Sequence, residues 1–434
     1  MNHLSSTIKR ILPKGSTGKS VLVLMSGTAI AQSITIAAMP LVTRLYTPEM
    51  IGVISVYLSF FNFWLTLLTW RYESALLITD DDDESHHVFR LGALLVLITA
   101  LLAIPALGAL QYFDVLGFEV LPVWASGVAC LSSLGFGWFM LYRTWLLRLQ
   151  QVKIISFSAV ARSSANSIVR VIGGLLGTGV FGLFAAEILG SWSALGLTRN
   201  KTKKLLQSPS PEWSITKIKT VAFRYRRFAQ YEMPSSVVNQ LAIALQVPIV
   251  GVLYGTQAAG WFGLARLLYA IPNGQIGKAA ADVFRMELGR YLREGNIERG
   301  IALFNAFTVR LALVGLIPLF IAIFAAPVLV PIIFGGEWHE MGLIVANMAP
   351  WMYALLVVSS MSVALSVLQR QDLKLYYDGF SLLLILFLYA YAEWSEIELL
   401  EFINYLSVIM VLSYIGYYFL IKRALTDCRR KPSY

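Results

Sequence analysis

The chain has 434 residues, of which 57% are hydrophobic and 14% charged, with a mean hydropathy of +0.67 and a formal net charge of +10. Soluble domains carry about a quarter charged residues, so this composition excludes an ordinary soluble enzyme. The two cysteines, Cys130 and Cys428, lie in an apolar block and a basic tail, so the sequence does not imply a disulfide framework.

Long, nearly uncharged apolar blocks follow one another along the chain. A block of about 20 such residues matches the ~30 Å hydrocarbon core of a bilayer. Each block is predicted to be a helix, because lipid offers the backbone no hydrogen-bond partner. The sequence predicts twelve spans, at 20–43, 51–76, 90–112, 119–141, 154–175, 178–197, 230–253, 260–283, 302–325, 341–366, 377–392 and 402–421.

The Lys and Arg residues outside the spans concentrate in alternate connections. They lie in the N-terminal segment, in 142–153, 198–229, 284–300 and 367–376, and in the C-terminal tail. The opposite set of connections holds only Arg44. The positive-inside rule therefore places both termini and the long connection 198–229 in the cytoplasm. The acidic connection 77–89 falls on the same side, and we expect it to be a solvated loop.

An internal repeat relates the first and seventh spans. The residues Gln32, Pro40, Val42, Leu45, Tyr46 and Gly52 have identical counterparts 208 residues later, at Gln240, Pro248, Val250, Leu253, Tyr254 and Gly260. Six spans separate the copies, so both run in the same direction across the membrane. The predicted fold is an all-α membrane protein of about twelve transmembrane helices, in two six-helix lobes related by a parallel repeat. We predict an N-lobe at 1–197, a basic cytoplasmic linker at 198–229 and a C-lobe at 230–434, with substrate bound between the lobes.

The same residues resemble a known family. The segments 26–32 and 40–52, the latter with Arg44, and the triplet Arg71-Tyr72-Glu73 resemble the signature of Wzx-type O-antigen flippases. In the second half, 225–234, 251–260 and 335–342 continue the resemblance. These flippases form the oligosaccharide branch of the multidrug/oligosaccharidyl-lipid/polysaccharide exporter (MOP) superfamily.

The resemblance implies a transporter and no enzymatic activity. A flippase of this kind moves an undecaprenyl-diphosphate-linked oligosaccharide unit from the cytoplasmic to the periplasmic leaflet of the bacterial inner membrane by alternating access. It serves lipopolysaccharide O-antigen, capsule or exopolysaccharide biosynthesis. Spans 1, 2, 7 and 8 line the cavity. The resemblance implies no cofactor, although some members use a proton or sodium gradient. Expected partners are the lipid-linked oligosaccharide, membrane lipids and other polysaccharide-assembly membrane proteins, but no nucleic acid.

Basic residues inside the spans are the candidate substrate-binding groups. A cation at the centre of a spanning helix costs about 2.5–3.5 kcal/mol, so such residues usually face water, a partner or a ligand. An excess of cations over acids suits a diphosphate, which accepts charge-assisted hydrogen bonds. Snorkelling to the interface or a buried ion pair is the structural alternative. The candidate cavity cations are Arg71, Arg162, Arg170, Arg266, Lys278 and Arg310.

Other polar residues in the spans also have two interpretations. The amides Gln32, Asn239 and Gln240 are candidates to bind sugar hydroxyls, or they join neighbouring helices. Arg44 is expected to tie a helix end, and Glu73 to pair with Arg71. Glu187 and Asp282 are expected to be arginine partners, with proton exchange as the alternative. No catalytic or metal-binding motif is present in the sequence.

Two alternative functions remain open. A multidrug/cation antiporter of the same fold would need acids in its cavity, whereas the charges within the spans are mainly positive. The second is a non-transporting role in polysaccharide assembly. Only a transport assay would separate a scaffolding subunit from a transporter, whereas a membrane enzyme would need catalytic groups in a large outward loop. The longest outward connection, 326–340, offers only Glu337, His339 and Glu340.

Overall fold

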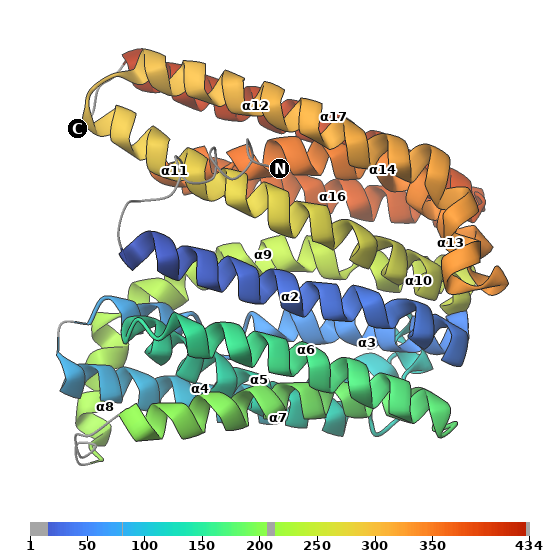
Figure 1. Ribbon diagram of the computed structural model, residues 1–434, viewed down its shortest axis with the longest axis horizontal. Helices are drawn as coiled ribbons and strands as arrows, with labels where there is room; N and C mark the ends of the chain where they lie inside the picture. The colour runs from blue at the N-terminus through green and yellow to red at the C-terminus, as the bar shows by residue number, and fades with distance from the viewer. Residues whose placement is uncertain (1–15, 80, 206–212, 431–434) are drawn as a thin grey trace. The chain divides into compact units, whose positions relative to one another are not determined.

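The computed structural model describes residues 16–79, 81–205 and 213–430, and all its regular elements are helical. The chain divides into two compact units, Met1–Pro248 and Ile249–Tyr434. The first unit contains α2 (Ser16–Leu45), α3 (Pro48–Leu65), η1 (Tyr72–Leu77), α4 (Asp82–Tyr112), η2 (Val115–Val120), α5 (Ala125–Arg148), α6 (Val152–Leu175), α7 (Val180–Leu205), α8 (Ile215–Arg224), η3 (Phe228–Glu232) and α9 (Met233–Ala244) (Figure 1).

The second unit begins within α10. Its elements are α10 (Gln246–Pro272), η4 (Asn273–Gly277), α11 (Lys278–Arg293), α12 (Ile297–Phe320), η5 (Ile321–Ala325), α13 (Ala326–Phe334), η6 (Gly336–Trp338), α14 (His339–Met361), α15 (Val363–Val367), α16 (Gln371–Ser395) and α17 (Leu399–Arg430). The predicted boundaries of the lobes and linker at 1–197, 198–229 and 230–434 stay a prediction.

Ten segments of the described residues are long and apolar enough to span a membrane. One of them, Phe228–Ala270, is divided by a break at Gly255 into the predicted spans 7 and 8. The helix α6 is also 24 residues long but carries Arg162 and Arg170. Dividing Phe228–Ala270 at Gly255 adds one span to the ten, and counting α6 adds another. The described residues therefore supply the twelve predicted spans.

The predicted second span, 51–76, is wrong in its last third. Thr47 caps α3 by accepting a hydrogen bond from the Met50 amide at 3.4 Å, and Pro48 begins the helix. The helix ends at Leu65, and turns lead into the short helix η1. Trp70 and Arg71 have φ values of 49° and 66°, a region that non-glycine residues rarely occupy. Hydropathy could not reveal this break, because the residues through it remain mostly apolar.

Two predicted outward connections also differ from the structure. The connection 254–259 is helical except at Gly255, whose φ of 86° and ψ of 169° break the helix. The connection 326–340 is not a loop, because it contains α13 and η6. Its Trp338 is fully buried, and its Glu337 carbonyl accepts a hydrogen bond from the Trp261 indole at 3.0 Å. The connection is therefore part of the packed unit.

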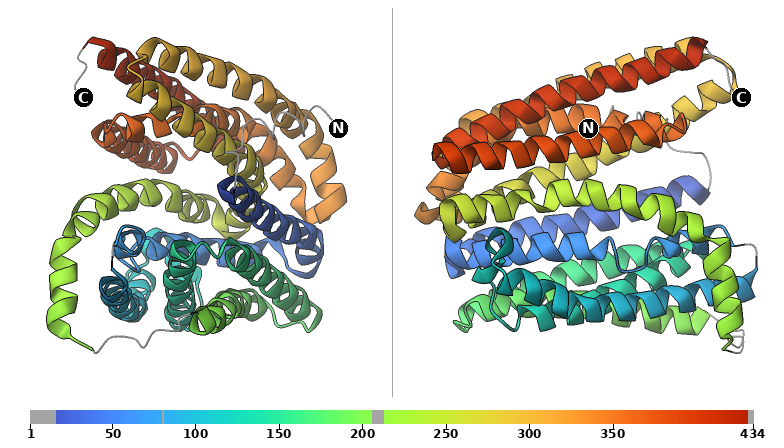
Figure 2. Two further views of the ribbon diagram at one scale, coloured as in Figure 1. Left: turned by 60° about the vertical axis from the view of Figure 1, so that its left-hand side comes forward. Right: turned by 180° about the vertical axis from the view of Figure 1, so that it is seen from behind.

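The first unit is held together by an apolar core near the ends of its spans. Leu68, Tyr72 and Leu76 from the broken second span pack with Val88 of α4 and Trp145 of α5. The amphipathic helix α8 contributes its buried face to the same core. Figures 1 and 2 show α8 running across the ends of the spans rather than alongside them.

The repeat tyrosines have equivalent structural roles in the two units. In the first unit, the Tyr46 hydroxyl donates to the Arg170 carbonyl near the C-terminal end of α6 at 2.8 Å. In the second unit, the Tyr254 hydroxyl donates to the Ile397 carbonyl just beyond α16 at 3.0 Å. Each tyrosine therefore ties the end of the first span of its half to the end of the fifth span of that half.

Candidate functional site

Arg71 lies at the break in the second span and contacts two carboxylates. Its guanidinium is 3.4 Å from Glu73 and 3.3 Å from Glu232, which ends η3. The Glu73 side chain is buried and also accepts a hydrogen bond from the Thr69 hydroxyl. The Glu232 side chain is 44% exposed. The predicted Arg71–Glu73 pair is present, and Arg71 also joins the broken second span to the segment that leads into α9.

Glu232 was not predicted from the sequence. The sequence does contain a feature that could have revealed it: Glu232 is the first acid after residues 213–231, which contain five cations and no acid. Its second carboxylate oxygen is buried without a hydrogen-bond partner among the described residues, as is the Nε of Arg71. In the Arg71–Glu232 ion pair, each side chain therefore keeps one buried polar atom without a hydrogen bond among the described residues.

The polar stripe of α6 faces the interior of the first unit. Arg170 and Asn166 both donate to the same Glu187 oxygen of α7, each at 2.8 Å. The Arg162 guanidinium lies 4.6 Å from the centroid of the Phe136 ring. Glu187 is thus an arginine partner, as expected, while contact of Arg162 and Arg170 with substrate stays a prediction.

The candidate cations of the second unit do not gather at one place. Arg266 lies within α10, Lys278 is the first residue of α11, directly after η4, and Arg310 lies in α12. Lys278 and Arg310 are exposed on their unit. By the 208-residue spacing Lys278 corresponds to Trp70, so in both halves a cation lies at or next to an interruption of the spanning helix.

The amide candidates lie on the first and seventh spans, as predicted. Gln32 is in α2, and Asn239 and Gln240 are in α9, each partly buried. Arg44 is exposed in the last turn of α2. Sugar binding by these residues stays a prediction.

The acidic connection is not the solvated loop that we expected. Asp82, Asp83 and Glu84, here called the acidic turn, form the first turn of α4. Asp82 pairs with Arg148 at 3.1 Å, Asp83 with Lys217 at 3.0 Å and Glu84 with Arg224 at 2.8 Å. Negative charge at a helix N-terminus is favourable in itself, and here it also holds α8 and the end of α5.

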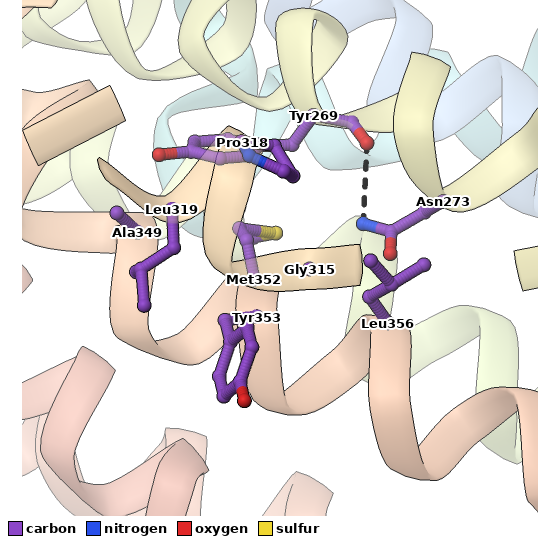
Figure 3. A pocket seen from close by; sticks show the side chains of 9 residues that line it. All are labelled: Tyr269, Asn273, Gly315, Pro318, Leu319, Ala349, Met352, Tyr353 and Leu356. Atoms are coloured by element: carbon purple, nitrogen blue, oxygen red, sulfur yellow. Dashed lines mark hydrogen bonds between the residues drawn. The ribbon is translucent and has the colours of Figure 1, made fainter. Parts of the chain in front are cut away.

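Two hollows lie within the second unit, and neither is lined by a candidate cation. The first has a volume of about 20 Å³, room for about one water molecule, beside Pro318 and Tyr353 (Figure 3). In this hollow the Asn273 amide donates to the Tyr269 carbonyl at 3.1 Å. The second is an apolar groove of about 490 Å³ between α16 and α17, walled by Phe380, Leu412 and Tyr417.

The fold resembles that of solved transporters. An inward-facing multidrug-resistance MATE family transporter of the MOP superfamily matches with a TM-score of 0.73 and 15% identity, over 94% of this chain and 99% of that one. A MATE transporter from Vibrio cholerae matches with a TM-score of 0.60 and 14% identity, over 99% of both chains. A MOP superfamily transporter from Pyrococcus furiosus matches with a TM-score of 0.57 and 14% identity, over 95% and 96%.

Family comparison agrees with the resemblance seen in the sequence. No curated protein matches the chain. A family described as "Polysaccharide biosynthesis protein" matches residues 41–343, which is more than half of the chain. The chain is a multi-pass membrane protein that belongs to this polysaccharide biosynthesis family and has the fold of the MOP-superfamily transporters.

Proposed function

We propose that the protein is a flippase that moves an undecaprenyl-diphosphate-linked oligosaccharide from the cytoplasmic to the periplasmic leaflet by alternating access. The observation that carries the proposal is unbalanced positive charge in apolar spans. Arg162 and Lys278 have no carboxylate within ion-pair distance among the described residues, whereas Arg71 and Arg170 do. A diphosphate supplies the missing anion, and guanidinium groups bind phosphate with directional, charge-assisted hydrogen bonds.

The charges also weigh against a cation exporter. Such a transporter needs a carboxylate free to bind its cargo, yet Glu73 and Glu187 are each held by an arginine. Asp282, which we expected to pair with an arginine, is exposed in α11 and has no ion pair among the described residues. The Pyrococcus furiosus transporter is described as having a binding pocket of reverse polarity that suggests a different function. We take the sign of the charge in the spans as the feature that separates cargo classes on this fold.

Biological context is part of the same proposal. We propose the bacterial inner membrane as the location, with both termini in the cytoplasm, and O-antigen, capsule or exopolysaccharide assembly as the pathway. The ion pairs of the acidic turn support this orientation, because their basic partners Arg148, Lys217 and Arg224 come from connections assigned to the cytoplasm. A proton or sodium gradient is the proposed driving force, without a cofactor.

Substitution of the cations tests the proposal. The wild-type protein and the Arg71→Ala, Arg266→Ala and Lys278→Ala variants are reconstituted in liposomes with a lipid-linked oligosaccharide, and its exposure at each leaflet is followed. Each alanine variant loses one charged hydrogen bond to the substrate, which is worth about 1.5–3 kcal/mol. We therefore expect each variant to move the lipid between leaflets roughly 10- to 100-fold more slowly than the wild type. Arg71→Lys keeps the charge but loses the bidentate geometry. Arg299→Ala, an exposed cation at the start of α12, is the control. Wild-type rates in all the cavity variants would refute the mechanism.

A further inference from the structure

The helix α8 has three distinct faces, and two of them have partners within the first unit. The first face is buried: it carries Ile218 and Val221 and continues to Tyr225 directly after the helix, and Val221 and Tyr225 belong to the apolar core of the unit. Lys217 and Arg224, seven residues apart, pair with Asp83 and Glu84 of the acidic turn. These contacts fix the rotation of α8 about its axis.

The third face of α8 is exposed and combines apolar with basic side chains. It consists of Ile215, Lys219 and Phe223 of α8 together with Arg226, two residues beyond the end of the helix, and these residues are spaced by three or four. Ile215 is 63% exposed and Phe223 is 70% exposed. The Arg226 guanidinium lies 3.8 Å from the centroid of the Phe223 ring. We call these four residues the outer face of α8.

The direction of α8 determines what this face can meet. The helix runs across the ends of the spanning helices, which is the orientation of a helix lying along a membrane surface (Figures 1 and 2). Trp213, just before the helix, is 58% exposed, and tryptophan is enriched at the membrane–water interface. Interfacial helices bury aromatic and aliphatic side chains at the headgroup boundary and present Lys and Arg to anionic lipids.

We propose that the outer face of α8 is a binding surface for anionic phospholipid headgroups of the adjacent leaflet. Residues 213–231 hold five cations and no acid, and only Lys217 and Arg224 are matched by the acidic turn. The other three are Lys219, Arg226 and Arg227, of which Lys219 and Arg226 lie on the outer face and attract phosphate, with Ile215 and Phe223 entering the headgroup boundary. Because the Tyr72 hydroxyl donates to the Ala222 carbonyl at 2.9 Å, lipid bound here also steadies the segment that carries Arg71.

The test measures which lipid surrounds α8 in the full-length protein. An environment-sensitive fluorophore is attached to Thr216→Cys, an exposed position, in a Cys428→Ser background in which buried Cys130 stays unlabelled. Two nanodisc samples are compared, one with a small fraction of spin-labelled phosphatidylglycerol and the other with the same fraction of spin-labelled phosphatidylcholine. Quenching of the fluorophore measures how much of each lipid lies beside α8. Because each of the two surface cations contributes about 1 kcal/mol to attraction of anionic lipid, we expect phosphatidylglycerol to be enriched up to roughly 30-fold beside α8 and therefore to quench more strongly than phosphatidylcholine. The difference should shrink in high salt.

A pair of charge-matched variants makes the result specific. Lys219→Gln/Arg226→Gln should abolish the headgroup preference. Arg293→Gln/Arg299→Gln removes the same charge from exposed positions of α11 and α12 and should leave the preference intact. Both proteins are first checked for a wild-type thermal transition. Equal quenching by the two lipids in the wild type, or a preference that survives Lys219→Gln/Arg226→Gln, would overturn the proposal. None of these readouts depends on which substrate the protein carries.

Discussion

Arg71 shows how one side chain can be both a structural tie and a candidate ligand for phosphate. Its two carboxylate partners differ in burial: the Glu73 side chain is 7% exposed and the Glu232 side chain is 44% exposed. Glu73 also has the Thr69 hydroxyl as a partner, whereas Glu232 is left with an unsatisfied oxygen. A phosphate that reaches Arg71 is therefore expected to displace Glu232 and leave the Glu73 pair in place.

Neutralising Glu232 tests this exchange. Glu232→Gln removes the anion that competes for Arg71, so the apparent affinity for a polyprenyl diphosphate should rise several-fold. Titration of the reconstituted protein with the lipid measures this affinity. Glu294→Gln removes a carboxylate from an exposed pair with Arg290 and should have no effect. Unchanged or weaker binding by Glu232→Gln would show that Glu232 does not compete with the substrate.

The buried charges of α6 and α7 lead to a prediction about stability. Glu187→Leu leaves Arg170 and Asn166 without their shared acceptor, and loss of one partner of a buried pair costs about 3–5 kcal/mol. Replacing both charges in Arg170→Leu/Glu187→Leu should recover much of this loss. Thermal unfolding of the purified proteins in detergent measures the difference. If the double variant is less stable than Glu187→Leu, the pair is not the main role of these residues.

At the scale of elements, the repeat explains why particular residues recur. Tyr46 needs close approach of α6 and α7: a Cβ added at Gly182 would lie 2.7 Å from the Tyr46 hydroxyl. Tyr254 makes the equivalent hydrogen bond in the second unit, but its acceptor is the carbonyl of a different type of residue, Ile397 rather than an arginine. The repeat therefore preserves a joint between the first and fifth spans of each half.

Removing the two hydroxyls tests whether the joints are equivalent. Tyr46→Phe and Tyr254→Phe should each lower stability by about 0.5–1.5 kcal/mol, the net contribution of one hydrogen bond. Tyr376→Phe, at an exposed position of α16, is the control. Thermal unfolding in detergent again provides the measurement. Clearly unequal losses would mean that the repeat in sequence does not reflect a repeat in function.

Sequence patterns predicted the spans well but not their interruptions. Span number followed from hydropathy, because every lipid-exposed backbone must be helical. The break at Arg71 did not follow, because the residues through it remain mostly apolar, and neither did the contact of Arg71 with Glu232, 161 residues away. The acidic turn was misjudged because its partners lie far away in the sequence, Arg148 at the end of α5 and Lys217 and Arg224 in α8.

The candidate site was predictable only as a set of residues. Intramembrane cations could be found from the sequence because their cost in lipid demands an explanation. Which of them are paired could not be found, because pairing depends on how helices rotate against one another. Arg170 turned out to be held by Glu187, while Arg162 rests on an aromatic ring.

For the whole molecule, fold and cargo are separate questions. The similar solved structures share 12–16% identity with this chain and therefore support the fold alone. The family match over residues 41–343 links the chain to polysaccharide biosynthesis. The proposed anionic lipid cargo rests on the sign of the charges in the spans, and transport by the intact protein tests it.

The most direct measurement compares two cargoes in the same proteoliposomes. One is a fluorescent undecaprenyl-diphosphate oligosaccharide, whose leaflet exposure is followed with a membrane-impermeant quencher. The other is a lipophilic cationic dye, whose accumulation is followed under a proton or sodium gradient. We predict protein-dependent movement of the lipid and none of the dye. Transport of the dye with no movement of the lipid would contradict it.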